Sequence, residues 1–298
     1  MKKFAIVYAI LAAALYAINI PFSKILLDYV GPTMMAAFLY LGAGVGMLLY
    51  GWVEQSTLKK EKREPLTRKE WPYVVGMVVL DIMAPILLML GITMTNSANV
   101  SLLNNFEIVA TSLIALLIFR EAISGKLWTA IVLVTIASAV LSFEGVESFV
   151  FNRGSLCVLG ACLCWGLENN CTKMISNRNS VEIVVIKGIF SGLGSLIVAF
   201  LIGESLPAVS WLIGVLLLGF VAYGLSINFY IKAQKYLGAA KTSAYYAIAP
   251  FLGVAFSMLF LGERPSVQFY IALGIMVVST YLMIKDSLNM PCGRSNKR

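Results

Sequence analysis

The sequence predicts an all-α membrane protein with many transmembrane helices, and three observations support this. Of the 298 residues, 59% are hydrophobic and 13% are charged, whereas a soluble globular protein has about 25% charged residues. The charges are bunched in short segments, above all KKEKREPLTRKE at 59–70. Apolar runs of about 20 residues separate these bunches, and that length crosses a bilayer as a helix.

The apolar runs, bounded by charges and by Gly/Pro turns, predict ten transmembrane helices. Those of the first half are 4–27, 33–53, 71–93, 97–119 and 126–143. Those of the second half are 154–176, 181–203, 209–234, 241–261 and 266–284. Most connections are short, so we expect consecutive helices to be antiparallel neighbours.

Basic residues gather in alternate connections. The segment 59–69 alone holds six lysines and arginines, whereas the connections on the opposite side hold only Arg153 and Arg264. By the positive-inside rule, both termini are expected to be cytoplasmic. We therefore expect a multi-pass protein of the plasma (inner) membrane.

The two halves of the sequence resemble each other. YAINIPFSK at 16–24 recurs as WGLENNCTK at 165–173, and GAGVG at 42–46 recurs as FSGLG at 190–194. The repeat predicts two five-helix units, 1–143 and 154–285, followed by a cytoplasmic tail, 286–298. Since five is odd, the second unit should be inverted in the membrane, as in secondary transporters with a site near the midplane. The first helix then matches an internal helix, so we expect it to be retained rather than cleaved as a leader.

These segments resemble a known family. YAINIPFSK and WGLENNCTK are similar to the first-helix pattern of the EamA family, in the drug/metabolite transporter superfamily. The runs 97–122 and 242–266 resemble its fourth- and ninth-helix patterns. The resemblance implies ten helices, of which the fifth and tenth are peripheral to a central cavity. It also implies transport of small metabolites, commonly export.

Polar and aromatic residues recur at helical spacing on several predicted helices. Trp165, Glu168 and Asn169 are i, i+3 and i+4, which places them on one face of a helix. Such faces could line one cavity, or they could form hydrogen bonds that hold helices together. The predicted substrate-binding residues are Tyr16, Asn19, Asn104, Asn105, Trp165, Glu168, Asn169, Tyr223, Tyr245 and Tyr246.

Four charged residues fall inside predicted spans. Asp81 and Glu107 are near mid-depth and have no evident partner in the sequence. Because a low-dielectric site favours the protonated form of a carboxyl group, both are candidates for proton coupling. A cationic group on the substrate is the rival explanation. Glu168 and Lys187 are at similar depth on consecutive helices, which predicts an ion pair of structural or functional role.

Prolines interrupt three predicted helices. Pro21, Pro85 and Pro250 each remove a backbone hydrogen bond within a span. In a membrane such interruptions are tolerated where neighbouring groups satisfy the freed backbone, as they do near a cavity.

The sequence contains no histidine, the commonest general base and metal ligand. It also has no phosphate-binding loop and no loop large enough for a catalytic domain. We therefore expect a secondary transporter rather than an enzyme, without metal or cofactor, that exports a small amphiphilic or amino-acid-like metabolite. Its expected partners are that substrate and the bilayer, not nucleic acid, and the oligomeric state stays open. The alternatives are a channel-like facilitative permease and, less favoured, a membrane-embedded enzyme or lipid-handling protein.

Overall fold

The computed structural model describes residues 2–57, 68–119, 124–142, 152–175, 178–237 and 245–289, and these residues form helices without any strand. By length and composition, six helical stretches can cross a membrane, and three shorter ones are also apolar. The six are Phe4–Leu26, Pro32–Val53, Arg68–Met94, Ser97–Ile118, Ser180–Leu201 and Val209–Ala233. The three are Trp128–Leu141, Ala249–Leu261 and Val267–Leu282.

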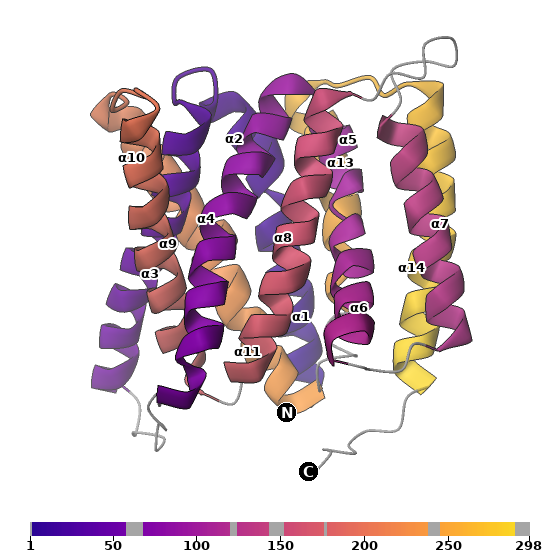
Figure 1. Ribbon diagram of the computed structural model, residues 1–298, viewed down its shortest axis with the longest axis horizontal. Coiled ribbons are helices and arrows are strands. Elements are labelled where there is room, and N and C mark those ends of the chain that lie inside the picture. Colours follow the sequence, from indigo (N-terminus) through magenta and orange to yellow (C-terminus); the bar gives the residue numbers. More distant parts are fainter. Residues whose placement is uncertain are drawn as a thin grey trace.

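Helix α8 (Arg153–Ile175) belongs to neither group, because Glu168, Asn169 and Asn170 lower its hydropathy. It lies against α4 (Trp71–Met94) and α6 (Phe106–Phe119) within the bundle (Figure 1). Polar side chains of a membrane helix are tolerated when they face other helices rather than lipid.

The remaining helices of the first half follow the predicted spans, with two interruptions. The first span consists of α1 (Lys2–Ala17) and α2 (Asn19–Leu26), and the fourth of α5 (Ser97–Leu103) and α6. The ring of Pro21 would clash with the carbonyl of Ala17 four residues earlier, which explains why α1 ends there. The other two helices are α3 (Pro32–Thr57) and α7 (Gly125–Ser142).

The second half also contains interrupted spans. After α9 (Ser180–Leu201), α10 (Val209–Gly219) passes through a π-helical turn, Phe220–Leu225, into α11 (Ser226–Leu237). Helix α13 (Ala249–Leu261) follows a turn at 247–248, where Pro250 clashes with the preceding helical turn. Helix α14 (Val267–Asn289) continues past the predicted end of its span, so part of the predicted tail is helical. Residues 290–298 of that tail, and 241–244 of the ninth span, lie outside the described residues.

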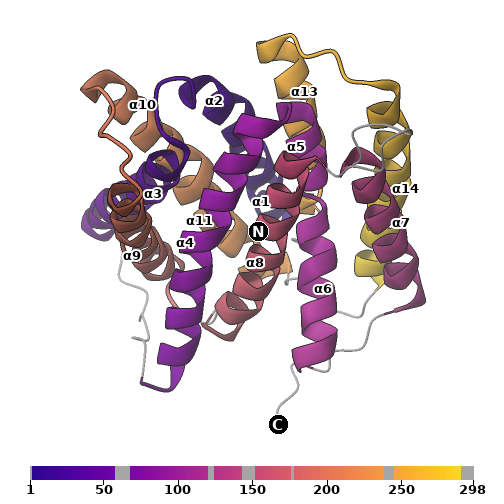
Figure 2. The same cartoon turned by 45° about the horizontal axis from the view of Figure 1, so that its top comes forward.

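The helices form one bundle in which the start of α1 and the end of α14 lie at the same end (Figure 1). α7 and α14 form one side of the bundle, and α3 and α9 lie together on the other (Figures 1 and 2). At the crossing of α3 and α9, a Cβ atom on Gly44 or Gly188 would meet backbone atoms of the opposite helix. Glycine at both positions therefore permits this close approach.

Two carboxylates from the second half cap helices of the first half at the other end of the bundle. Glu204 accepts hydrogen bonds from the backbone N–H groups of Thr33 (3.1 Å) and Met34 (2.6 Å) at the start of α3. Glu263 accepts from the N–H groups of Ser97 and Ala98, both at 2.8 Å, at the start of α5. Each carboxylate satisfies N–H groups that have no partner within their own helix.

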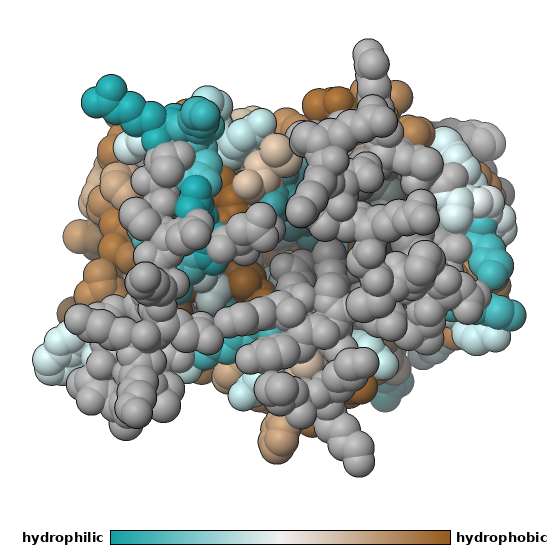
Figure 3. Space-filling view, turned by 90° about the horizontal axis from the view of Figure 1, so that it is seen from below, coloured by the Kyte–Doolittle hydropathy of each residue, from teal (hydrophilic) through white to brown (hydrophobic). Residues whose placement is uncertain are grey.

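Large apolar side chains are exposed around the bundle. Leu117, Leu201 and Val267 are 76%, 80% and 76% exposed. Figure 3 looks onto the end at which α1 begins, and hydrophobic residues lie along the left edge of this view. Such extensive apolar exposure is not found on soluble monomers and fits a surface in contact with lipid.

Candidate functional site

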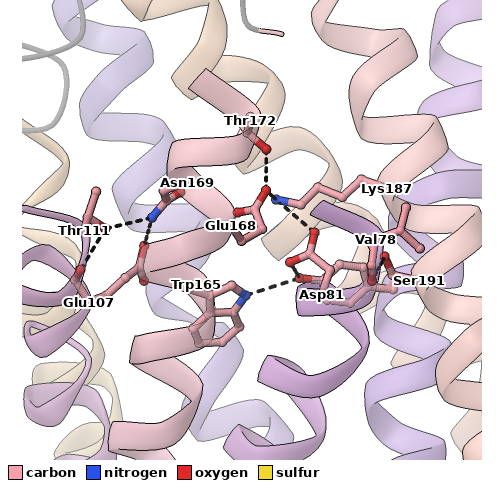
Figure 4. A network of polar contacts seen from close by, with 11 residues as sticks. Val78, Asp81, Glu107, Thr111, Trp165, Glu168, Asn169, Thr172, Lys187 and Ser191 are labelled. Carbon is pink, nitrogen blue, oxygen red and sulfur yellow. Dashed lines mark hydrogen bonds and ion pairs between the residues drawn. The ribbon is translucent and has the colours of Figure 1, made fainter. Parts of the chain in front are cut away.

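Three charged side chains meet inside the bundle, and we call Asp81, Glu168 and Lys187 the charge cluster (Figure 4). Lys187 Nζ on α9 lies 3.2 Å from Asp81 Oδ2 on α4 and 3.0 Å from Glu168 Oε1 on α8. All three residues are buried. The predicted proximity of Glu168 and Lys187 is therefore present, and Asp81, for which the sequence suggested no partner, shares the same ammonium group.

Hydrogen bonds hold the two carboxylates of the charge cluster in place. The hydroxyl of Tyr40 on α3 donates to Asp81 Oδ1 at 2.8 Å, and the indole N–H of Trp165 donates to that hydroxyl at 3.4 Å. The hydroxyl of Thr172 donates to Glu168 Oε1 (Figure 4). Each carboxylate thus has a neutral donor besides Lys187, which lowers the cost of burying it.

Glu107 occupies the other side of α8. The amide of Asn169 donates to Glu107 Oε1 at 2.7 Å and lies 3.3 Å from the hydroxyl of Thr111 (Figure 4). Glu107 lies in the first turn of α6, just after the interruption between α5 and α6. Within the described residues it forms no ion pair, and it is only partly buried. It therefore differs from Asp81, although the sequence made both residues candidates for proton coupling because of their similar depth in the predicted spans.

The charge cluster and the contacts of Glu107 together form the polar network around α8. Consecutive residues of α8 make contacts on its two sides. Glu168 reaches the charge cluster, whereas Asn169 reaches Glu107 (Figure 4). The next residue, Asn170, donates to the backbone oxygens of Thr111 (3.2 Å) and Gly166 (2.8 Å), which attaches α8 to α6. Three adjacent polar residues of α8 thus each form polar contacts, Glu168 with Lys187 and the two asparagines with groups on α6.

Tyrosines from several helices form a second group, the tyrosine cluster of Tyr16, Tyr40, Tyr223, Tyr230 and Tyr246. The ring of Tyr16 lies 5.9 Å from those of Tyr223 and Tyr246, and the ring of Tyr40 lies 5.2 Å from that of Tyr223. The ring centroids of Tyr230 and Tyr246 are 5.0 Å apart. Since Tyr40 also binds Asp81, the tyrosine cluster is continuous with the charge cluster.

Asn19 joins the tyrosine cluster from α2. Its amide donates to the Tyr223 hydroxyl at 3.1 Å, and its oxygen accepts from Ser23 at 3.1 Å. One connected group of side chains therefore contains the predicted residues Tyr16, Asn19, Trp165, Tyr223 and Tyr246.

Three predicted binding residues lie apart from this group. Asn105 donates to the backbone oxygen of Leu102 at 3.2 Å and faces Met276 of α14, so it points toward a peripheral helix. Asn104 is buried beside Cys162, and its amide nitrogen has no hydrogen-bond partner within the described part of the chain. Tyr245 is half-buried and takes part in no ring contact among the described residues. The two asparagines lie at the interruption of the span, where the side chain of Asn105 competes with the helical backbone.

The three prolines differ in their effect on the helices. Pro21 and Pro250 follow the interruptions at Ile18 and at 247–248, whereas Pro85 lies inside the continuous helix α4, one turn after Asp81. Because a proline provides no N–H to the carbonyl four residues earlier, Pro85 leaves the backbone oxygen of Asp81 without its helical donor.

Tyr40 is a residue of this network that the sequence analysis did not identify. Its signal was a tyrosine hydroxyl in the middle of the apolar run MMAAFLYLGAG, where a buried hydroxyl requires a partner. The pairing of Asp81 with Lys187 depends on the contact between α4 and α9. These helices are separated by most of the chain's middle third, so no local pattern indicates their contact.

Helices of membrane-spanning length around a buried network of ionisable groups define a polytopic membrane protein of the transporter class. The chain belongs to the EamA-like transporter family, whose model matches residues 3–143 and 152–285. This confirms the resemblance seen in the sequence, and it points to a transporter rather than an enzyme.

One curated relative agrees with the family assignment, and one solved structure shares the fold. The chain is 23% identical, over 296 residues, to an uncharacterized transporter of Methanothermobacter thermautotrophicus, covering 92% of this chain and 84% of that one. It also resembles a protein of known crystal structure, with a TM-score of 0.68 and 15% identity, over 97% of this chain and 99% of the other. At that identity the structural likeness concerns the fold alone.

Proposed function

We propose that this membrane transporter is a secondary carrier that exports a small amphiphilic or amino-acid-like metabolite across the plasma membrane by alternating access. It has ten transmembrane helices in two inverted five-helix halves, 1–143 and 154–285, with both chain ends in the cytoplasm. The observation that carries the proposal is the buried polar network, which connects the two halves. Asp81 and Glu107 come from the first half, and their partners Lys187 and Asn169 come from the second.

The contacts between helices support the inverted repeat. The equivalent second and seventh spans, α3 and α9, contact each other, as do the fifth and tenth, α7 and α14. The third span contacts the sixth through α4 and α8, and the eighth contacts the first through α11 and α1. A pseudo-two-fold axis that relates the halves would generate these pairs together.

The balance of charges supports proton coupling. In the described part of the network there are three carboxyl groups, those of Asp81, Glu107 and Glu168, and one ammonium group, that of Lys187, which contacts only Asp81 and Glu168. A buried uncompensated charge is costly, so at least one carboxyl group is expected to take up a proton or to meet a cation. Glu107 is the stronger candidate, because it alone forms no ion pair among the described residues and is partly accessible.

The test is transport by the full chain in proteoliposomes, with a panel of small amphiphilic metabolites and with or without an imposed pH gradient. We expect the gradient to drive accumulation by the unaltered protein. Glu107→Gln should lose that accumulation while retaining exchange of labelled for unlabelled substrate without a gradient. The exposed carboxylate Asp28 provides a matched control, and Asp28→Asn should behave as the unaltered chain.

Two other outcomes are informative. Gradient-driven accumulation that is unchanged in Glu107→Gln would refute the coupling role of this residue. Loss of exchange as well as accumulation, restricted to substrates with a positive charge, would instead indicate that Glu107 binds a cationic group of the substrate. A unitary conductance in single-channel recording would favour the channel-like alternative.

A further inference from the structure

An apolar groove runs along the outside of the bundle between α4 and α9, which lie side by side (Figures 1 and 2). Its volume is about 300 Å³. Apart from Trp71 at its end, it is lined by Val74, Val75, Val78, Val79, Ile186 and Phe190. Among the residues that the structure describes, this wall offers no polar side chain to an occupant.

The groove opens toward the surroundings of the bundle rather than toward the charge cluster. Val75 and Phe190 are 52% and 58% exposed. Its floor is fixed, because the hydroxyl of Ser191 on α9 donates to the backbone oxygen of Val78 on α4 at 3.2 Å. A stable apolar groove on a lipid-facing surface is suited to an acyl chain.

Basic residues stand at one end of the groove. Arg68 and Lys69 are exposed in the 3₁₀ turn that directly precedes Trp71, and neither forms an ion pair within the described residues. The acidic residue of this turn, Glu70, is bound by Arg178 at 2.7 Å. The mouth of the groove therefore carries positive charge that Glu70 does not neutralise. Tryptophan at such a position is typical of the interface between lipid headgroups and acyl chains.

We propose that an anionic phospholipid binds here, with its phosphate at Arg68 and Lys69 and an acyl chain in the groove. At about 1.5 Å per residue, Trp71 to Val79 spans about 12 Å along α4. Half of a hydrocarbon core of about 30 Å is of similar length. With the cytoplasmic termini proposed above, this is the inner leaflet, where anionic lipids attract basic segments. The binding itself does not depend on that orientation.

The position of the groove connects the lipid with the charge cluster. Ile186 immediately precedes Lys187, and Val78 is one turn before Asp81 on the same helix. A bound chain would therefore contact both α4 and α9 next to the ion pair of these two residues.

The test uses the full chain, reconstituted in vesicles of phosphatidylcholine and phosphatidylglycerol, extracted in mild detergent, and analysed by native mass spectrometry for retained lipid. We expect phosphatidylglycerol to be retained in preference to phosphatidylcholine. Arg68→Gln with Lys69→Gln should lower that preference, by about fivefold for each charge removed. The control is Lys126→Gln with Lys285→Gln, which removes two exposed charges elsewhere.

A second pair of variants tests the groove independently of charge. Val75→Trp fills the groove, whereas Val132→Trp on α7 places the same side chain at a position that is also 52% exposed. We expect Val75→Trp to lower retention of both lipids and Val132→Trp to have no effect. Equal retention of the two lipids by the unaltered chain, or equal losses in test and control variants, would overturn the proposal. Neither result would bear on whether the chain is a proton-coupled carrier.

Discussion

Lys187 and Glu168 are joined at 3.0 Å inside the bundle, yet their ion pair is not exclusive, because Lys187 also contacts Asp81. We predict that Lys187→Met is more destabilising than Glu168→Gln. The first change leaves two buried carboxylates without their cation and should cost about 3–5 kcal/mol. The second leaves Lys187 paired with Asp81 and should cost less. Thermal unfolding in detergent, followed by tryptophan fluorescence, measures both.

The double variant Lys187→Met/Glu168→Gln distinguishes a structural from a functional pair. If the pair is structural, the double variant should be more stable than Lys187→Met alone and should regain transport. If transport stays lost while stability returns, Glu168 or Lys187 acts on the substrate. Equal destabilisation by the two single changes would contradict the shared ion pair.

Asn169 and Asn105 were both predicted from the sequence as substrate-binding residues, but in the structure only Asn169 lies in the polar network. Asn169→Ala removes the hydrogen bond to Glu107 and should reduce the rate of transport in proteoliposomes. Asn105→Ala alters a contact with Met276, outside the network, and should leave that rate close to the unaltered value. The prediction fails if the two variants transport equally well at equal amounts of inserted protein.

The crossing of α3 and α9 should not tolerate a side chain at Gly188. In Gly188→Ala the new methyl group would meet the backbone of Gly44, so we expect a loss of about 1–3 kcal/mol in stability. Gly274 on α14 is a matched control, because a Cβ there has no atom of another described element within 4 Å. Gly274→Ala should be neutral or stabilising by up to about 1 kcal/mol, since alanine favours helix. Thermal unfolding of both variants, measured side by side, tests this prediction, and equal stability of the two would contradict it.

Glu263 is predicted to stabilise the start of α5. Glu263→Ala removes the acceptor for the N–H groups of Ser97 and Ala98 and should cost about 1–2 kcal/mol. Hydrogen exchange should then accelerate at these two amides and not in α9, which has its own cap at Asn179. Asp28→Ala, at an exposed position, serves as control. Unchanged exchange at Ser97 and Ala98 in Glu263→Ala would contradict the prediction.

Much of the helical architecture could be predicted because it depends on local composition. Apolar runs and their flanking charges gave most helix ends within a few residues, as for α4, predicted at 71–93 and found at Trp71–Met94. The interruptions were harder to predict. Pro21 and Pro250 suggested two of them, but the break at Asn104–Asn105 has no proline, and the π-helical turn at Phe220–Leu225 has no evident local signal.

The sequence could predict which residues belong to the candidate site better than it could predict which of them contact each other. Helical spacing indicated that Trp165, Glu168 and Asn169 share a face, and these residues do lie in one network. Spacing could not show that Glu168 and Asn169 reach opposite sides of α8. That division arises because α8 packs against both α4 and α6, and such contacts are set by tertiary packing.

The interruption between α5 and α6 has an electrostatic consequence. Because α6 begins at Phe106, its N-terminus lies inside the bundle, with Glu107 in the first turn. The aligned peptide dipoles of a helix give this end about half a positive elementary charge. A carboxylate at this position thus has a partial counter-ion that consists of backbone alone. The break supplies Glu107 with some of the stabilisation that Lys187 gives to Asp81, without a side chain that would have to move away to admit a substrate or a proton.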